Sequence, residues 1–295
     1  MIFCAALAVL TQAVVTRDSR GELLAPPNPV LAAADEAWMR RDRGRIAGRA
    51  SPRQISEAIS GYEKAAEAPD AVEPRWKLAR GLFFKAKYTG LDGDSQLALF
   101  EKACQAGEEA VAILRRRTDA SGTSLASDAP PLRVAAALSR APDAAPAYFW
   151  AAVAWGEWGL LAGRLKGAKT GTATKVRDYA STVIALDPEF EEGGGYRILG
   201  RLHHRAPRIP FLTGWVSRSE AVRNLRLAVR TGPRNFVNRH FLAEALADGG
   251  PAERKEAIRI EREVVADAPS PGHLVEDLAI QEEAKRNLLA WSKRT

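Results

Sequence analysis

The chain has 295 residues, of which 46% are hydrophobic and 27% are charged, so it can build a packed core and is not intrinsically disordered. Alanine, leucine, arginine and glutamate are abundant, a mixture that favours helices over strands. The formal net charge is +7, but the arginines are spread over many segments beside acidic residues. That pattern favours a solvated, salt-bridged surface over a nucleic-acid site. The two cysteines, Cys4 and Cys104, lack metal-ligand spacing, so no zinc site is predicted.

The first residues have the pattern of a leader. Residues 1–15 are apolar over about the length of a signal-peptide core and are too short to cross a bilayer as a helix. Residues 17–29 hold charges, Gly21 and three prolines, which is typical of a linker. We predict a leader and linker over residues 1–29, one helical-repeat domain over residues 30–295, and export of the chain. Cys4 lacks the preceding residues of a lipoprotein cysteine, so no lipid anchor is predicted. The alternative to a leader is that residues 1–15 form a buried first helix.

From residue 30 onward the pattern is helix, turn, helix, repeated. The first pair is expected over about residues 31–41 and 52–68, because Ser51 and Pro52 form a good N-cap and first helical residue. The second pair opens at Trp76, and Arg80 occupies a position that such pairs usually give to a small residue. Residues 118–131 are expected to form a loop.

Three more pairs follow. The third begins near Pro146 and ends at Asp187-Pro188. The fifth is divided by Gly249-Gly250, and a last amphipathic helix over about residues 272–291 is expected to cap the stack.

The fourth pair carries the clearest repeat signature, at the spacing of the tetratricopeptide repeat. The matching residues are Tyr196, Leu199, Gly200 and His203 in its first helix and Ala221, Leu225, Ala228 and Pro233 in its second. Residues 206–217 between the two helices are expected to be an insertion. The fold class is therefore predicted to be all-α, a tetratricopeptide-like helix-pair solenoid with about five helix pairs plus a C-terminal capping helix.

Motifs of catalysis are not found in the sequence. The run from Glu191 to Gly195 is rich in glycine, but no strand precedes it and no Lys-Ser or Lys-Thr follows, so it is not a phosphate loop. Carboxylate pairs such as Glu108-Glu109 have the pattern of solvated helix faces. We predict that the protein is not an enzyme and uses no cofactor or metal.

Aromatic residues are concentrated between residues 148 and 158. They predict either the packed core of a helix pair or the wall of an apolar cavity for a hydrophobic ligand. The ligand-cavity candidates from this run and from the fourth pair are Tyr148, Trp150, Trp155, Trp158, Tyr196 and His203.

Basic residues gather near the end of the first helix of the fourth pair. They favour either a solvated face or a patch that docks an acidic partner or anionic ligand. These partner-docking candidates are Arg197, Arg201, His204, Arg205 and Arg208.

Several short motifs occur along the chain in an order that a known family shares. They are residues 34–38 (ADEAW), 57–59 (EAI), 62–65 (YEKA), 148–159 (YFWAAVAWGEWG), 187–188 (DP), 194–200 (GGYRILG), Pro207, Pro210, Asn238 and 242–246 (LAEAL). In this order the sequence resembles the T component of tetratricopeptide-repeat-associated TRAP transporters, the TatT-like family, over about residues 34–269.

The resemblance implies an exported, all-helical periplasmic protein, often lipid-anchored, that associates as a trimer and pairs with a TRAP solute-binding receptor. It also implies that the receptor's ligand is a small, hydrophobic organic acid and that each protomer encloses a cavity. By the same analogy, the aromatics of residues 148–158 would form its wall.

Four classes of function follow from these features. The first is a non-enzymatic periplasmic scaffold or binding protein for solute uptake, and the alternative is a general tetratricopeptide scaffold in envelope assembly. A closed aromatic cavity would favour the first, and an open groove for an extended peptide would favour the second. RNA binding would need one continuous basic face, and an enzyme would need titratable groups converging in a cleft.

Overall fold

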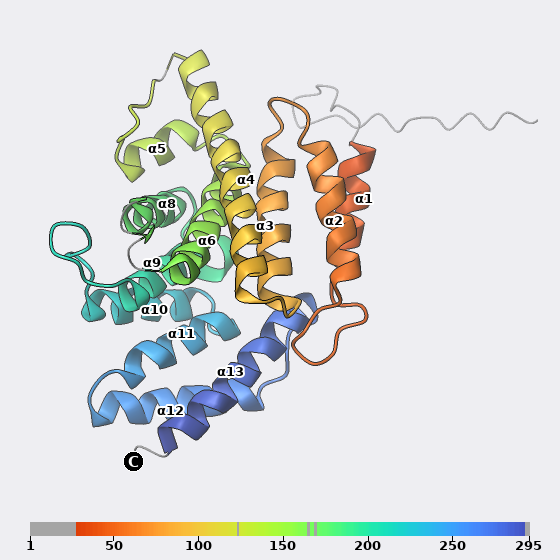
Figure 1. The fold of residues 1–295 in the computed structure, drawn as a ribbon. Helices are drawn as coiled ribbons and strands as arrows, with labels where there is room; N and C mark the ends of the chain where they lie inside the picture. The colour runs from red at the N-terminus through yellow and green to blue at the C-terminus, as the bar shows by residue number, and fades with distance from the viewer. Residues whose placement is uncertain (1–27, 123, 164–165, 168–169, 293–295) are drawn as a thin grey trace, which may run out of the picture.

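The computed structural model describes residues 28–122, 124–163, 166–167 and 170–292, and its elements in these ranges are helices (Figure 1). The prediction of an all-α fold is confirmed. Of the expected leader and linker over residues 1–29, residues 1–27 lie outside the described residues, and the first helix begins at Pro29 with Asn28 as its N-cap.

Consecutive helices pack as pairs along the described chain. The pairs are α1 (Pro29–Met39) with α2 (Pro52–Ala65), α3 (Val72–Tyr88) with α4 (Gly93–Ala120), α6 (Ala144–Ala162) with α8 (Thr172–Leu186), α9 (Phe190–Arg205) with α10 (Arg218–Thr231), and α11 (Phe236–Ala247) with α12 (Pro251–Ala266). Each pair also packs on the next, so the apolar faces are buried between pairs. The helix-pair solenoid predicted from the sequence is therefore present.

Local sequence explains where the helices begin and how closely they approach. Ser51 accepts a hydrogen bond from Arg53 N at the start of α2, as its position before Pro52 predicts. In the fourth pair, Leu225 is fully buried, and a Cβ added at Gly200 would lie 2.6 Å from Leu225 Cγ. The repeat motif thus places a large residue against a glycine where α9 and α10 cross.

Two segments differ from the expectations. α4 runs for 28 residues, to Ala120, and an additional short helix, α5 (Pro131–Leu138), packs on α8. The segment expected as a loop is therefore shorter than residues 118–131, because the apolar residues of α5 find a partner in α8.

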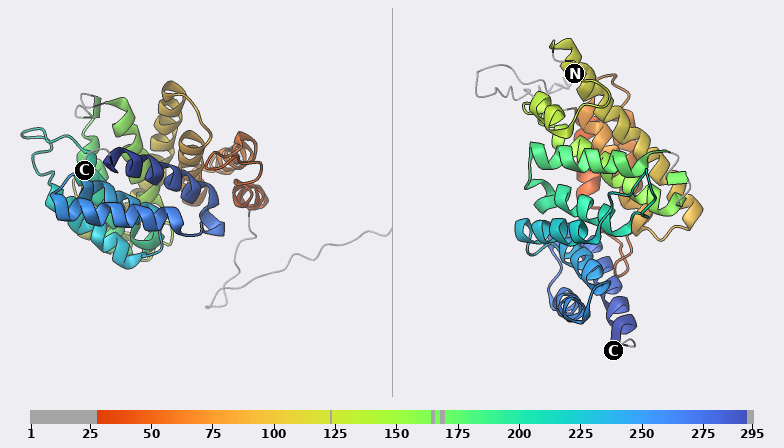
Figure 2. Two further views of the ribbon diagram at one scale, coloured as in Figure 1. Left: turned by 90° about the horizontal axis from the view of Figure 1, so that it is seen from below. Right: turned by 90° about the vertical axis from the view of Figure 1, so that its left-hand side faces the viewer.

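The C-terminal helix does more than cap the stack. After a short 3-10 turn, η1 (Pro271–His273), α13 (Leu274–Ser292) packs on α11 and α12 and also contacts α3 (Figures 1 and 2). Val275 joins the apolar core that α1 to α4 form with part of α6, whereas Ile280 and Ala284 join the core of the last pairs. One helix therefore links the two ends of the solenoid.

Candidate functional site

A cavity of about 400 Å³ lies on the inner side of the solenoid, between α3, α6 and α9 and the returning α13. Residues from α1, α8, α11, η1 and the 206–217 loop also line it. The first helix of each pair thus faces the cavity, and in the third pair the start of the second helix, α8, lines it as well.

α13 covers one side of this cavity through contacts with the α1–α2 segment. Arg41 forms an ion pair with Glu276 at 2.9 Å and also donates to the carbonyl oxygen of Gly272. Gly48 packs so closely that an added Cβ would lie 2.6 Å from Ala279 N. These contacts convert what would be an open groove into a partly enclosed space.

Aromatic rings form much of the wall. Trp150 lies 5.8 Å from Phe83 and 5.0 Å from Phe149, measured between ring centroids, so α3 and α6 share one aromatic surface. Trp38 and Phe84 meet edge to face at 5.5 Å on the α1 side. Such a surface suits a largely apolar ligand.

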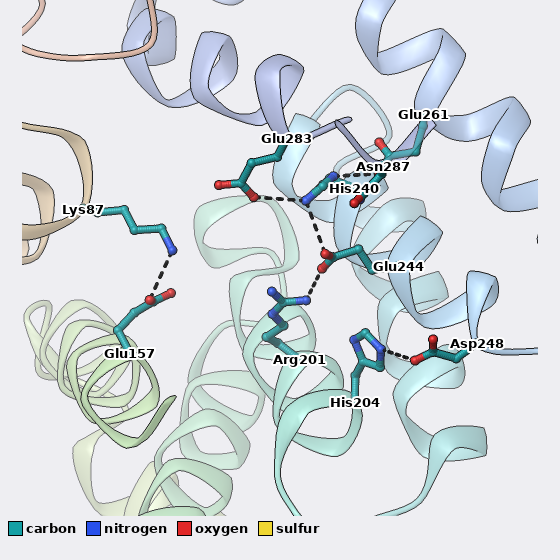
Figure 3. A network of polar contacts seen from close by, with 10 residues as sticks. All are labelled: Lys87, Glu157, Arg201, His204, His240, Glu244, Asp248, Glu261, Glu283 and Asn287. Carbon is teal, nitrogen blue, oxygen red and sulfur yellow. Dashed lines mark hydrogen bonds and ion pairs between the residues drawn. The ribbon is translucent and has the colours of Figure 1, made fainter. Parts of the chain in front are cut away.

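Charged residues beside the cavity form two groups, one between α3 and α6 and one between α9, α11 and α13 (Figure 3). Lys87 pairs with Glu157 at 3.2 Å. Glu283 of α13 lies 3.3 Å from His240 Nε2, and Arg201 forms an ion pair with Glu244. Because most of these charges are paired with each other, they connect the helices around the cavity.

His240 is the centre of this network and is fully buried. Its Nδ1 lies 2.9 Å from Glu261 Oε1, and Asn287 donates to the same oxygen. Burial alone would lower the pKa of His240, but the hydrogen bonds to Glu261 and Glu283 outweigh it and raise the pKa to about 9. His240 is therefore a buried cation at neutral pH.

A left-handed turn begins α9 beside the cavity. Glu191, Glu192 and Gly193 have φ values of 51°, 56° and 82°, a conformation that costs about 1–2 kcal/mol for each non-glycine residue. Asn238 donates to Glu192 O at 2.9 Å, and Arg197 donates to Glu191 O at 3.0 Å. These hydrogen bonds hold the strained carbonyl groups in place.

Of the aromatic residues predicted to line a cavity, one lies in the cavity wall and the others do not. Trp150 lies in the cavity wall, whereas Tyr148, Trp155 and Trp158 do not. Trp155 Nε1 donates to Glu108 at 2.6 Å and Trp158 Nε1 donates to Glu101 at 3.2 Å, so both rings face α4. Trp155 and Trp158 contact each other, with ring centroids 5.3 Å apart, on a face of α6 that differs from the face carrying Trp150.

Tyr148 and the two candidates of the fourth pair also lie away from the wall. Tyr148 is buried against Tyr179 of α8, with ring centroids 5.2 Å apart. His203 Nδ1 accepts from Ser217 N, and its ring meets Trp215 edge to face at 5.3 Å. Tyr196 is half-buried on α9 and is not among the lining residues.

The predicted basic patch divides into two sets. Arg197 and Arg201 line the cavity, with Arg205 at its exposed edge. His204 pairs with Asp248 at 2.9 Å, and burial lowers the pKa of His204. Arg208 is exposed on the 206–217 loop. The five residues therefore do not form one continuous docking face.

Several wall residues were not among the sequence candidates, notably Phe83, Lys87 and Glu283. Arg80 had a signal, because it stands where the repeat usually has a small residue. In the structure its guanidinium lies 3.9 Å from the Trp38 ring centroid and 5.2 Å from that of Trp76. The arginine that replaces a small residue in the repeat therefore lies on α3, a helix that faces the cavity.

The described residues also bear on metal binding and on membrane insertion. They contain no group of three or more His, Cys, Asp or Glu residues placed to hold a metal ion. None of the described helices is long and apolar enough to cross a membrane.

Comparison with known proteins gives a likeness in structure but none in sequence. No family model matches the chain, and no curated protein sequence matches it. Among solved structures, the chain is similar to the "TPR2AB-domain:pHSP90-complex of yeast Sti1", with a TM-score of 0.32 and 14% identity over 89% of this chain and 97% of that one. Because the TM-score is low, the description of the fold as a helix-pair solenoid rests on the packing of this chain itself.

Proposed function

We propose that this chain is a non-enzymatic binding protein that holds a small, largely apolar organic acid in the cavity beneath α13. The observation that carries the proposal is the aromatic cavity of about 400 Å³, covered by a helix that returns from the far end of the chain. Small-molecule sites have volumes of roughly 300–1,000 Å³ and mostly apolar walls. A solenoid that binds an extended peptide would keep its groove open along its length.

The wider role we propose is that of the T component of a TRAP-type uptake system. The order of motifs over about residues 34–269 supports it, as does the presence of an aromatic cavity, which the resemblance implies. In this role the protein is exported to the periplasm, forms trimers, and associates with a solute-binding receptor that carries the same acid.

Affinity capture from a periplasmic extract of the native host tests this role. The tagged full chain, as the host processes it, is the bait, and mass spectrometry identifies the proteins recovered. Recovery of an extracytoplasmic solute receptor supports the uptake role. Recovery of envelope-assembly proteins without a receptor contradicts it.

A general protein–protein scaffold is the second candidate, and the 206–217 loop favours it. Phe211 at its tip is fully exposed with a φ of 63°, and Leu212 beside it is half exposed. Loops that hold an apolar side chain in solvent commonly serve recognition. If this candidate is right, Phe211→Ser removes the captured partners, whereas filling the cavity leaves them bound.

A further inference from the structure

The cations around the cavity fall into two groups. Arg41, Lys87 and Arg201 each form an ion pair with a carboxylate, as described above. Arg80, Arg197 and Arg205 also line the cavity, and none of them forms an ion pair with any residue that the structure describes. Arg205 lies at the exposed edge, so Arg80 and Arg197 are the candidates for binding an anion inside the cavity.

Arg197 presents a free edge. Its Nη1 donates to Glu191 O at 3.0 Å and to Asn238 Oδ1 at 2.9 Å. No described residue accepts a hydrogen bond from its Nε or Nη2, and neither atom is among the buried donors that lack a partner. Nε and Nη2 form one edge of a guanidinium, and that edge matches the two oxygens of a carboxylate.

The position of Arg197 is fixed by its surroundings. Its guanidinium lies 5.7 Å from the ring centroid of Phe149, which belongs to the aromatic wall. Through Nη1 it is tied to the left-handed turn and, through Asn238, to α11. Non-glycine residues in this strained conformation often occur at functional sites. Here the carbonyl oxygen of Glu191 in the turn accepts a hydrogen bond from Nη1 of Arg197. Because Nη1 makes both hydrogen bonds, the edge formed by Nε and Nη2 stays free.

The charge of Arg197 is incompletely compensated. Burial lowers its pKa, and the carboxylates of Glu191 and Glu192 act in the opposite direction without coming within ion-pair distance. An anion in the cavity would therefore gain more from Arg197 than from a solvated arginine, because water competes less.

Arg80 is less suited to the same task. Its guanidinium lies close to the rings of both Trp38 and Trp76, and its Nη2 donates to the Tyr62 hydroxyl. Its Nε is buried without a partner, so the corresponding edge is closed to a ligand. Arg80 completes the aromatic wall, whereas Arg197 keeps two accessible donors.

We propose that Arg197 binds the acid group of the cavity's ligand through Nε and Nη2, while the apolar part of the ligand lies against Phe149 and Trp150. This assignment rests on the proposed function and adds the residue that selects an acid over a neutral compound of the same shape.

Calorimetric titration with matched acids and amides tests the assignment. The probes are phenylacetate, 4-phenylbutyrate and 1-naphthylacetate, each with its primary amide, and the full chain is used. For the wild-type protein we expect the best acid to bind at least tenfold more tightly than its amide. In Arg197→Gln the ratio of acid affinity to amide affinity should fall to about one. The affinity of this variant for the amide should stay within about threefold of the wild-type value. Arg197→Lys keeps the charge but loses the paired donors, so its ratio should be intermediate.

Two further variants serve as controls. Arg208→Gln, at an exposed position outside the cavity wall, should bind acids and amides as the wild-type protein does. Arg80→Gln alters the aromatic wall, so it should weaken acid and amide alike and keep their ratio. An unchanged ratio in Arg197→Gln, or loss of the ratio in Arg80→Gln instead, would overturn the assignment while leaving a ligand-binding cavity in place. If neither acids nor amides bind the wild-type protein, the proposed function fails as well.

Discussion

At the scale of single residues, His240 has the clearest consequence for stability. Its pKa is about 9 in the folded chain, against an ordinary value near 6.5. The protonated form therefore stabilises the fold fully below about pH 6.5, and this contribution is lost as the pH rises through 9. Its full size is on the order of 3 kcal/mol, at about 1.4 kcal/mol for each pKa unit.

We therefore predict that the free energy of unfolding falls between pH 7 and pH 10 more steeply in the wild-type chain than in His240→Gln. Urea unfolding at several pH values measures it. The variant should also be less stable at pH 7, because Glu261 is left buried without its cation. Parallel pH profiles for the two proteins would show that His240 is not the titrating group.

The left-handed turn gives a second prediction at this scale. Glu191→Gly should raise the free energy of unfolding by up to about 1 kcal/mol, because glycine adopts a positive φ without steric cost. Gly193→Ala should lower it, since its φ is 82° and its Cβ would lie 2.9 Å from Thr231 Cβ. Thermal or urea unfolding measures both changes. Equal effects of the two substitutions would contradict the strain described here.

Single residues also show what the sequence could predict. The approach of Gly200 to Leu225 follows from repeat spacing, because both lie at fixed positions of one helix pair. The separation of Trp150 from Trp155 also follows from the sequence. Five residues turn a helix by about 500°, which leaves the two side chains about 140° apart. Closeness along the chain was a poor guide to closeness in space.

At the scale of elements, α13 determines whether the inner surface is a groove or a cavity. No local pattern predicts this, because the contacts that bring α13 to Gly48 and Glu276 to Arg41 join residues more than 230 positions apart. The amphipathic pattern of residues 272–291 predicted a helix correctly. It could not predict that Val275 and Ala279 would pack on the first pairs while Ile280 and Ala284 pack on the last.

The contact between α13 and the α1–α2 segment can be loosened by one methyl group. Gly48→Ala should destabilise the chain by about 1–3 kcal/mol, because the new Cβ has no room against Ala279. We expect amide hydrogen exchange to increase in the first half of α13 more than in α12. Gly250→Ala is the matched control, since a Cβ there meets nothing within 4 Å. Unchanged exchange in α13 would mean that this contact does not hold the helix.

At the scale of the whole molecule, the solenoid, its returning helix and the aromatic wall together form one binding space. Gly156 of α6 lines this space, and a Cβ added there meets nothing within 4 Å. A large side chain at this position can therefore fill the cavity without a backbone clash. Gly156→Ala removes the same glycine from the helix while leaving the cavity open, and it should stabilise α6 by up to about 1 kcal/mol.

The most direct test of the central claim is native mass spectrometry of the chain purified from its own host. We expect wild-type protein and Gly156→Ala to retain one small acidic compound per chain, and Gly156→Trp to retain none while remaining folded. Retention of the same compound by Gly156→Trp, or no bound compound in any of the three proteins, would contradict the account of the cavity as a ligand site.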